Sequence, residues 1–194
     1  MQLCLHGAAD VHLGRLVETL PPVMRALECL GAWTVIATRE LKANLAKVAA
    51  SRALRDAPEP TLSAVLDWEC AARPPMHGRG RVADESAAMG LQWLCRFLSL
   101  WTQVWRTPRL PTFREALDGG YAKNIQPYHS WMLQNAFAIA ITIVPTWEEA
   151  HEYFAAFDPE GEEGVLSAVG VLDTVVGRIE AALRARHLWD DRRI

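Results

Sequence analysis

The chain has 194 residues, a length typical of one domain that can bury a sizeable hydrophobic core without disulfides or metal ions. Hydrophobic residues make up 51% of it, and the formal net charge is −3. This charge gives no general attraction to nucleic acid or to anionic membranes, so any membrane contact has to be local. We therefore expect a single domain over residues 1–194 that binds no nucleic acid.

The spacing of the four cysteines bears on whether the chain has a zinc site or a disulfide scaffold. They are widely spaced and form no C-x-x-C pair, which argues against a zinc site and against a disulfide scaffold. We expect reduced cysteines in the core: Cys4, Cys29, Cys70 and Cys95.

Two further segments bear on membranes. The first ten residues lack the basic and apolar regions of a signal peptide, so we expect a cytoplasmic protein that contacts membranes only peripherally. The longest uncharged stretch, residues 124–147, is strongly apolar only from 136 to 144. A membrane-spanning helix needs about 20 apolar residues. This stretch predicts a buried helix instead.

Apolar residues recur about every 3.6 positions, and glycine and proline stand at the joints, so the fold should be all-α. The predicted helices cover residues 9–30, 32–55, 61–72, 83–106, a shorter segment from Pro111 to Gly119-Gly120, 127–144, 146–156 and 162–187. Prolines 21 and 22 predict a kink or a restart inside the first helix. Between the third and fourth helices, the basic residues 73–81 favour a solvated loop over a contact with phosphate head groups.

A polar cluster lies on the second predicted helix. Glu40, Asn44 and Lys47 are spaced so that they span about 60° of its circumference. The apolar residues one or two turns earlier on the same side are Trp33, Ile36 and Ala37. The cluster should therefore face the core or its edge. Burying a neutral polar group without a partner costs roughly 2–7 kcal/mol, so a polar partner must meet these side chains.

Two later helices contribute aromatic and histidine side chains. The helix over 83–106 has a wide apolar face, which includes Trp93, Phe97, Leu100, Trp101 and Val104. The helix over 127–144 has His129 at the head of a stripe that should face the core. Trp131 projects about 160–200° away from that stripe, so it should be exposed near the start of the helix.

Three functions compete for these residues. In an enzyme, Glu40 and His129 would exchange protons and Lys47 would be an electrophile, but no nucleophile motif, glycine-rich phosphate loop or metal spacing accompanies them. We therefore expect no catalytic residue, cofactor or metal. In an ordinary helical interaction domain, Glu40 and Lys47 would pair with each other. The third possibility is a recognition site for a polar head group at the mouth of an apolar cavity.

Three motifs support the third possibility. They are Glu40-x-x-x-Asn44-x-x-Lys47, Trp93-Leu-Cys-Arg96 and His129-Ser-Trp131. Their spacing resembles the glycolipid transfer protein superfamily, which has Asp-x-x-x-Asn-x-x-Lys, Trp-Leu-x-Arg and His-x-Trp. Further similarities are Leu-Pro-Pro at 20–22, Leu30-Gly31, Tyr121 and Pro145. The resemblance covers nearly the whole chain.

The resemblance implies a two-layer sandwich of about eight α-helices that encloses an apolar lipid pocket. It also implies a monomeric, non-enzymatic carrier that binds one glycosphingolipid and transfers it between membranes. Trp93 would stack on the first sugar ring, and Asn44 and Lys47 would hydrogen-bond sugar hydroxyls.

The resemblance also assigns residues to the contacts with the ceramide and with the membrane. Glu40 would take the place of the family's aspartate, which accepts from the ceramide amide and the sugar. His129 would donate to the ceramide carbonyl. Trp131 would dock on the bilayer interface, although an outward tryptophan would serve a protein interface equally well.

The head group and the mode of action stay open. Ceramide-1-phosphate carriers have a basic residue at the position of Asn44 and arginines at those of Trp93 and Phe97, so this chain resembles the sugar-binding branch. Arg96, a secondary head-group contact, keeps ceramide-1-phosphate and sulfatide as alternatives. Because Glu40 is longer than aspartate, a sphingolipid sensor with little transfer activity is a further alternative.

Overall fold

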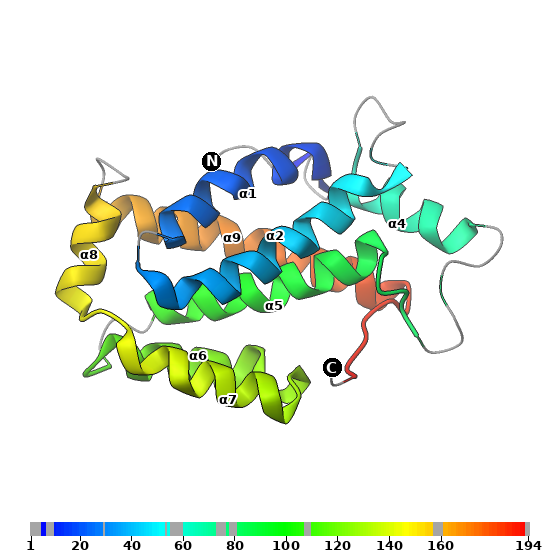
Figure 1. Ribbon diagram of the computed structural model, residues 1–194. Coiled ribbons are helices and arrows are strands. Elements are labelled where there is room, and N and C mark those ends of the chain that lie inside the picture. The colour runs from blue at the N-terminus through cyan, green and yellow to red at the C-terminus, as the bar shows by residue number, and fades with distance from the viewer. Residues whose placement is uncertain are drawn as a thin grey trace. The chain divides into compact units, whose positions relative to one another are not determined.

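The computed structural model describes residues 5–6, 10–28, 30–52, 54, 60–72, 77, 81–106, 110–156 and 161–192. The α-helices in these ranges are α1 (Leu13–Glu28), α2 (Val35–Ala50), α4 (Leu62–Ala71), α5 (Ala87–Arg106), α6 (Phe113–Asn124), α7 (Trp131–Ala140), α8 (Trp147–Ala155) and α9 (Gly161–Ala185) (Figure 1). Short 3-10 helices are η1 (Ala32–Thr34), η2 (Gln126–Tyr128) and η3 (Ile141–Ile143). The all-α prediction is confirmed.

One small feature was not predicted. Strands β1 (Leu5–His6) and β2 (Asp10–Val11) pair antiparallel as a two-residue hairpin. It leads into α1, whose first residue donates its N–H to the Pro60 carbonyl at 2.9 Å. Within α1 the helix continues through prolines 21 and 22, so the predicted restart does not occur.

Local side chains explain several helix boundaries. The hydroxyls of Thr61 and Thr112 accept hydrogen bonds from backbone N–H groups at the first turns of α4 and α6, at 3.3 and 3.1 Å. Gly31, the predicted cap between the first two helices, has a φ of 113°, which favours glycine. Trp33 closes this joint, because its indole N–H donates to the Leu30 carbonyl at 2.8 Å.

The prediction that a helix ends at Gly119-Gly120 is wrong, because α6 runs on to Asn124. A Cβ on Gly120 would lie 3.2 Å from the carbonyl oxygen of Leu100. This glycine therefore permits the close approach of α5 and α6. Its role in packing is invisible in a local sequence pattern.

The predicted helix over 127–144 is also wrong as a continuous element. It is divided into η2, α7 and η3. His129 stands at the break, with extended φ and ψ of −84° and 140°. The amide of Gln134 donates to the carbonyls of Gln126 and His129, at 3.1 and 2.9 Å, so it satisfies acceptors that the break releases. No residue of α7 is fully buried, which corrects the expectation of a buried helix.

The chain forms two compact units, and it passes from one to the other within α1, α2, α5 and α9. Unit 1 comprises Met1–Pro21, Glu40–Cys95 and Thr174–Asp190, and unit 2 comprises Pro22–Arg39, Arg96–Asp173 and Asp191–Ile194. The expected single domain stays a prediction. In the core of unit 1, aliphatic side chains such as Leu13, Leu20, Leu66, Leu94 and Ile179 are almost fully buried.

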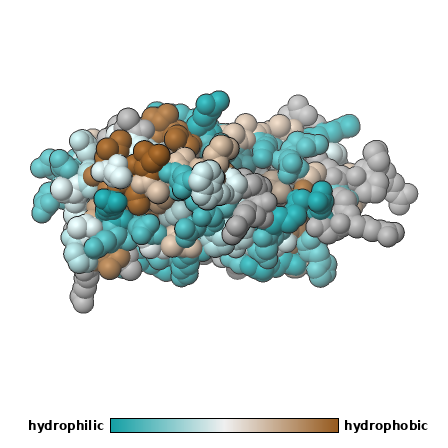
Figure 2. Space-filling model, turned by 60° about the horizontal axis from the view of Figure 1, so that its bottom comes forward, coloured by the Kyte–Doolittle hydropathy of each residue, from teal (hydrophilic) through white to brown (hydrophobic). Residues whose placement is uncertain are grey.

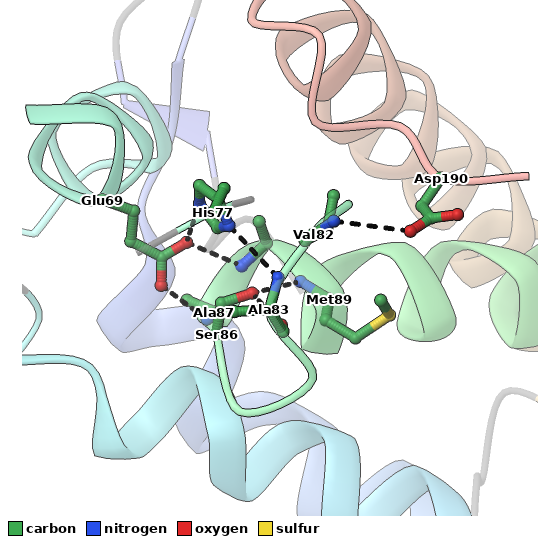
Figure 3. A network of polar contacts seen from close by, with 9 residues as sticks. Glu69, His77, Val82, Ala83, Ser86, Ala87, Met89 and Asp190 are labelled. Carbon is green, nitrogen blue, oxygen red and sulfur yellow. Dashed lines mark hydrogen bonds and ion pairs between the residues drawn. The ribbon is translucent and has the colours of Figure 1, made fainter. Parts of the chain in front are cut away.

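In unit 1 a buried carboxylate fixes the start of α5. Glu69 is 1% exposed and accepts the N–H groups of Ala87 and Ala88 at 2.6 and 3.0 Å (Figure 3). Burial raises the pKa of Glu69, and the two backbone donors oppose that rise. The Nε2 atom of His77 lies 3.7 Å from the same carboxylate. Sequence analysis missed this network, because its members are far apart along the chain.

The core of unit 2 is aromatic. The Trp33 ring lies 6.2 Å from the Trp101 ring and 6.3 Å from Phe113. Phe113 in turn meets Trp147 edge-on at 4.9 Å, and Trp105 meets Trp147 at 5.8 Å. Edge-on and tilted contacts of this kind add to the stabilisation from burial. The predicted inward faces of the second and fourth helices supply two of these rings, those of Trp33 and Trp101.

The cysteine predictions divide three ways. Cys95 is buried, as expected, whereas Cys70 is exposed, which corrects the prediction of a core residue. Cys4 and Cys29 lie outside the described residues, as does most of the predicted basic loop over 73–81.

Candidate functional site

The predicted polar cluster of α2 lies in unit 1, and its side of the helix is only partly buried. Asn44 is 6% exposed, Lys47 is half-buried and Glu40 is exposed. Ile36, one turn before Glu40, is 58% exposed. The prediction that the stripe before the cluster faces the core is therefore wrong at Ile36, whereas the prediction that the cluster lies in the core or at its edge is correct at Asn44.

Asn44 has an unsatisfied buried acceptor. Its amide Nδ2 donates to the Glu40 carbonyl at 2.9 Å. Its Oδ1 atom is buried and accepts no hydrogen bond within the described part of the chain. An unsatisfied group of this kind costs about 1–3 kcal/mol. Such an atom is ready to accept a hydrogen bond from a ligand.

The charged members of the cluster do not neutralise each other. Within the described ranges, the Glu40 carboxylate and the Lys47 ammonium form no ion pair. The interaction-domain alternative predicted such a pair. Both charges therefore remain available to a polar ligand.

A glycine brings α5 against this cluster. A Cβ on Gly90 would lie 2.5 Å from the carbonyl oxygen of Asn44 and 3.2 Å from the Lys47 Cβ, so only glycine fits between the two helices. Trp93 is three residues further along α5 and lies on nearly the same side of that helix. Trp93 is half-buried. Sequence analysis predicted a role for Trp93, which stays a prediction, and it missed Gly90.

The second group of predicted residues lies in unit 2 and centres on His129. The Tyr121 hydroxyl and the His129 Nδ1 are 3.0 Å apart. The Phe137 ring stacks on Tyr121 at 3.5 Å with an interplanar angle of 9°. Burial and the nearby charge of Arg96 lower the pKa of His129 to about 4, and burial raises the pKa of Tyr121 to about 12. Both side chains are therefore neutral near pH 7.

Neutral histidine has one N–H and one acceptor nitrogen. The Tyr121 hydroxyl can donate to Nδ1 or accept from it, and where it donates, the histidine proton lies on Nε2. That tautomer presents His129 Nε2 as a hydrogen-bond donor.

Arg96 lies close to this histidine and is 4% exposed. Its guanidinium lies 3.5 Å from the centre of the Tyr128 ring, in a cation–π arrangement. Its Nη2 is 4.0 Å from the carboxylate of Asp191, which is 65% exposed. A buried arginine held in this way is a fixed positive charge.

The outward projection of Trp131 is confirmed. It is the first residue of α7 and is 78% exposed. Met132, Ile139 and Ile143 on α7 and η3 are 70, 72 and 65% exposed. Figure 2 shows a hydrophobic patch on the side of the molecule that carries α6 and α7. Among the described residues, no helix is long and apolar enough to cross a membrane.

Comparisons with known proteins identify the family of the chain. The model of the glycolipid transfer protein family matches residues 11–155. The chain belongs to the glycolipid transfer protein family. A search among curated proteins found no match.

Solved structures of this family share the fold. The GLTP-fold of FAPP2, described as selecting simple glycosphingolipids, is 18% identical and has a TM-score of 0.81, with 99% of this chain and 94% of that chain covered. Human ceramide-1-phosphate transfer protein with bound 12:0 ceramide-1-phosphate is 20% identical, with a TM-score of 0.82 and coverage of 96% and 93%. The fungal glycolipid transfer protein HET-C2 is 16% identical, with a TM-score of 0.73 and coverage of 92% and 88%.

Proposed function

We propose that this protein is a single-domain, non-enzymatic carrier that binds a glycosphingolipid and moves it between membranes. Membership of the family supports a lipid carrier. The observation that carries the choice of a polar, hydroxyl-bearing head group is the buried Asn44 Oδ1 atom, which accepts nothing from the described residues. A sugar hydroxyl is a donor of suitable size for it.

A carrier of this kind has a clear physical task. Pulling a ceramide out of a bilayer exposes on the order of 30 methylenes at about 0.8 kcal/mol each, so unassisted desorption is very slow. An apolar protein interior offers the chains an equivalent environment. No bond is made or broken, so the chemistry needs only recognition.

The head group would be recognised by the α2 cluster and Trp93. The Trp93 indole would stack on the first sugar ring, whose C–H groups suit an aromatic face. The Asn44 oxygen and the Lys47 ammonium would hydrogen-bond sugar hydroxyls. Glu40 would accept from the sugar and the ceramide amide, and its exposure in the lipid-free chain leaves its carboxylate free to turn toward them.

The ceramide carbonyl would be recognised by His129. A carbonyl oxygen needs a donor, and donation from the Tyr121 hydroxyl to Nδ1 would leave the histidine proton on Nε2 for this contact. The lowered pKa keeps His129 neutral, so binding adds no charge to an apolar setting. Tyr121 is thus a positioning residue in this proposal.

One observation favours a second candidate ligand. The buried guanidinium of Arg96 is a cation near His129, and phosphate or sulfate groups bind arginine well. Ceramide-1-phosphate or sulfatide is therefore the alternative cargo. A sensor that binds sphingolipid without moving it is the alternative mode of action.

Transfer between vesicles tests these possibilities. We expect the protein to move fluorescent galactosylceramide faster than ceramide-1-phosphate, sulfatide or phosphatidylcholine. Transfer of ceramide-1-phosphate alone would overturn the choice of a sugar. If no lipid moves, binding of galactosylceramide measured by tryptophan fluorescence separates a sensor, which binds, from a protein with a different function, which does not.

A further inference from the structure

The segment after α9 leaves the helix at a defined point. His187 adopts a left-handed φ of 56°, and the Leu188 N–H donates to the Leu183 carbonyl at 2.9 Å. This is the hydrogen bond of a Schellman cap, which ends a helix and redirects the chain. Leu188 is 4% exposed, so its side chain anchors the new direction in the core.

Beyond this turn, Asp190 is held against α5 by paired hydrogen bonds, which we call the Asp190 clamp. The Asp190 N–H donates to Gln92 Oε1 at 3.0 Å, and the Asp190 carbonyl accepts from Gln92 Nε2. The Asp190 carboxylate accepts from the Val82 N–H at 3.4 Å (Figure 3). Asp190 is 7% exposed and is held through both backbone and side chain. The direction in which the chain continues is therefore set.

The residue that follows this clamp is Asp191, whose carboxylate lies 4.0 Å from Arg96 Nη2. The two partners differ in solvent exposure, because the Arg96 side chain is 4% exposed whereas the Asp191 side chain is 65% exposed. The cation is thus fixed by the fold, and its counter-ion is presented from the solvent side.

We propose that Asp191 is a specificity-determining residue that occupies the positive charge of Arg96 and so disfavours sphingolipids with anionic head groups. The inference rests on the proposed function. A phosphate or sulfate that approached Arg96 would come close to the Asp191 carboxylate, and like charges at short range disfavour binding. An uncharged sugar meets no such repulsion. The ion pair therefore weakens the binding of anionic head groups and leaves the binding of uncharged sugar head groups unchanged.

The test is Asp191→Asn, which removes the charge and keeps the size of an exposed side chain. The transfer rates of ceramide-1-phosphate and galactosylceramide are measured in parallel between neutral phosphatidylcholine vesicles. We expect the ratio of the two rates to rise about tenfold, which corresponds to about 1.4 kcal/mol. The galactosylceramide rate should stay within about twofold. The rise should shrink as salt increases, because salt screens exposed charges.

Two controls make this result specific. Asp173 pairs with Arg106 in the same unit, but that arginine is 59% exposed, so Asp173→Asn removes an aspartate–arginine pair that has no buried cation and should leave the ratio unchanged. In an Arg96→Gln background, Asp191→Asn should have no further effect, because the charge that Asp191 occupies is already gone.

The outcomes separate a failure of the role of Asp191 from a failure of the proposed function. A ratio that stays within twofold of wild type, or that rises equally in Asp173→Asn or in the Arg96→Gln background, overturns the role of Asp191. If the wild-type protein neither binds nor transfers either sphingolipid, the proposed function itself is overturned, and the inference falls with it.

Discussion

At the scale of single residues, Asn44 and Asn124 form an informative pair. Both donate Nδ2 to the carbonyl four residues earlier, at 2.9 and 2.8 Å. Asn124 also donates to Gln103 Oε1 at 3.0 Å, whereas the Oδ1 of Asn44 is buried without a partner among the described residues. The Asn124 amide thus donates both to helix backbone and to a side chain, whereas Asn44 has a buried acceptor that no described residue satisfies.

We therefore predict opposite effects of the same substitution. Asn44→Leu should leave the melting temperature of the lipid-free protein unchanged or raise it, because it removes an unsatisfied polar atom. It should also lower the galactosylceramide transfer rate by at least about tenfold. Asn124→Leu should lower stability by about 1 kcal/mol. Equal destabilisation by both variants, with transfer retained in Asn44→Leu, would contradict a ligand-binding role for Asn44.

His129 makes stability depend on pH. Its folded pKa, about 4, lies below the ordinary value of 6.5, so the unfolded chain binds more protons between these two values. The stabilisation from neutral His129 is therefore complete above about pH 6.5 and is lost as the pH falls toward 4. The loss should reach at most about 3 kcal/mol.

Urea denaturation of wild type and His129→Gln at pH 7 and pH 4.5 measures this contribution. The wild-type protein should lose more stability between the two pH values than the variant does. His77, whose pKa is also lowered by burial, contributes equally to both proteins and so cancels. An identical loss in both proteins would show that His129 is not held neutral by the fold.

At the scale of elements, the contact between α2 and α5 depends on Gly90. Ala at this position would force Cβ to within 2.5 Å of the Asn44 carbonyl oxygen, which belongs to rigid helix backbone. We expect Gly90→Ala to lower the free energy of unfolding by about 2 kcal/mol or more. It should also weaken galactosylceramide binding, because it shifts the helix that positions Asn44 and Lys47.

Gly119 provides the matched control. It also lies inside a helix, but a Cβ there would meet nothing within 4 Å. Gly119→Ala should therefore raise stability by roughly 0.5–1 kcal/mol, which is the ordinary benefit of alanine in a helix. If both alanine variants are equally stable, the close approach of α2 and α5 is not a constraint.

At the scale of the whole molecule, a carrier must touch a membrane and then leave it. The net charge of −3 offers no general electrostatic attraction, so a local apolar surface has to provide the contact. The uncharged outer face of α7, with Trp131 at its start, is suited to this task. Tryptophan favours the interface between lipid and water.

We predict that Trp131→Ala reduces both vesicle binding and galactosylceramide transfer by about tenfold, because partial burial of an aromatic side chain is worth about 1.5 kcal/mol or more. Its melting temperature should stay near that of wild type, since the ring is 78% exposed. Trp68, 39% exposed on α4, is the control, and Trp68→Ala should bind vesicles normally. Vesicle co-sedimentation measures both. Equal binding by wild type and Trp131→Ala would exclude docking through Trp131.

The sequence by itself determined what is local and periodic. The repeat of apolar residues every 3.6 positions predicted an all-helical chain, and the predicted third helix began at Thr61, whose hydroxyl caps α4. The outward direction of Trp131 also followed from helix geometry. Three short motifs sufficed to indicate the family, because each holds particular side chains at a particular spacing along the chain.

Only the tertiary structure decided what depends on distant neighbours. Gly120 reads as a helix end until its contact with the Leu100 carbonyl is known, and Gly90 reads as an ordinary helical residue until α2 lies against it. His129 leaves the helix because the Gln134 amide can satisfy the carbonyls at the break. Asp191 comes close to Arg96 where the chain has turned away from α9 at His187 and Gln92 holds Asp190. Packing distances and long-range hydrogen bonds arise only when the chain folds, so no local pattern records them.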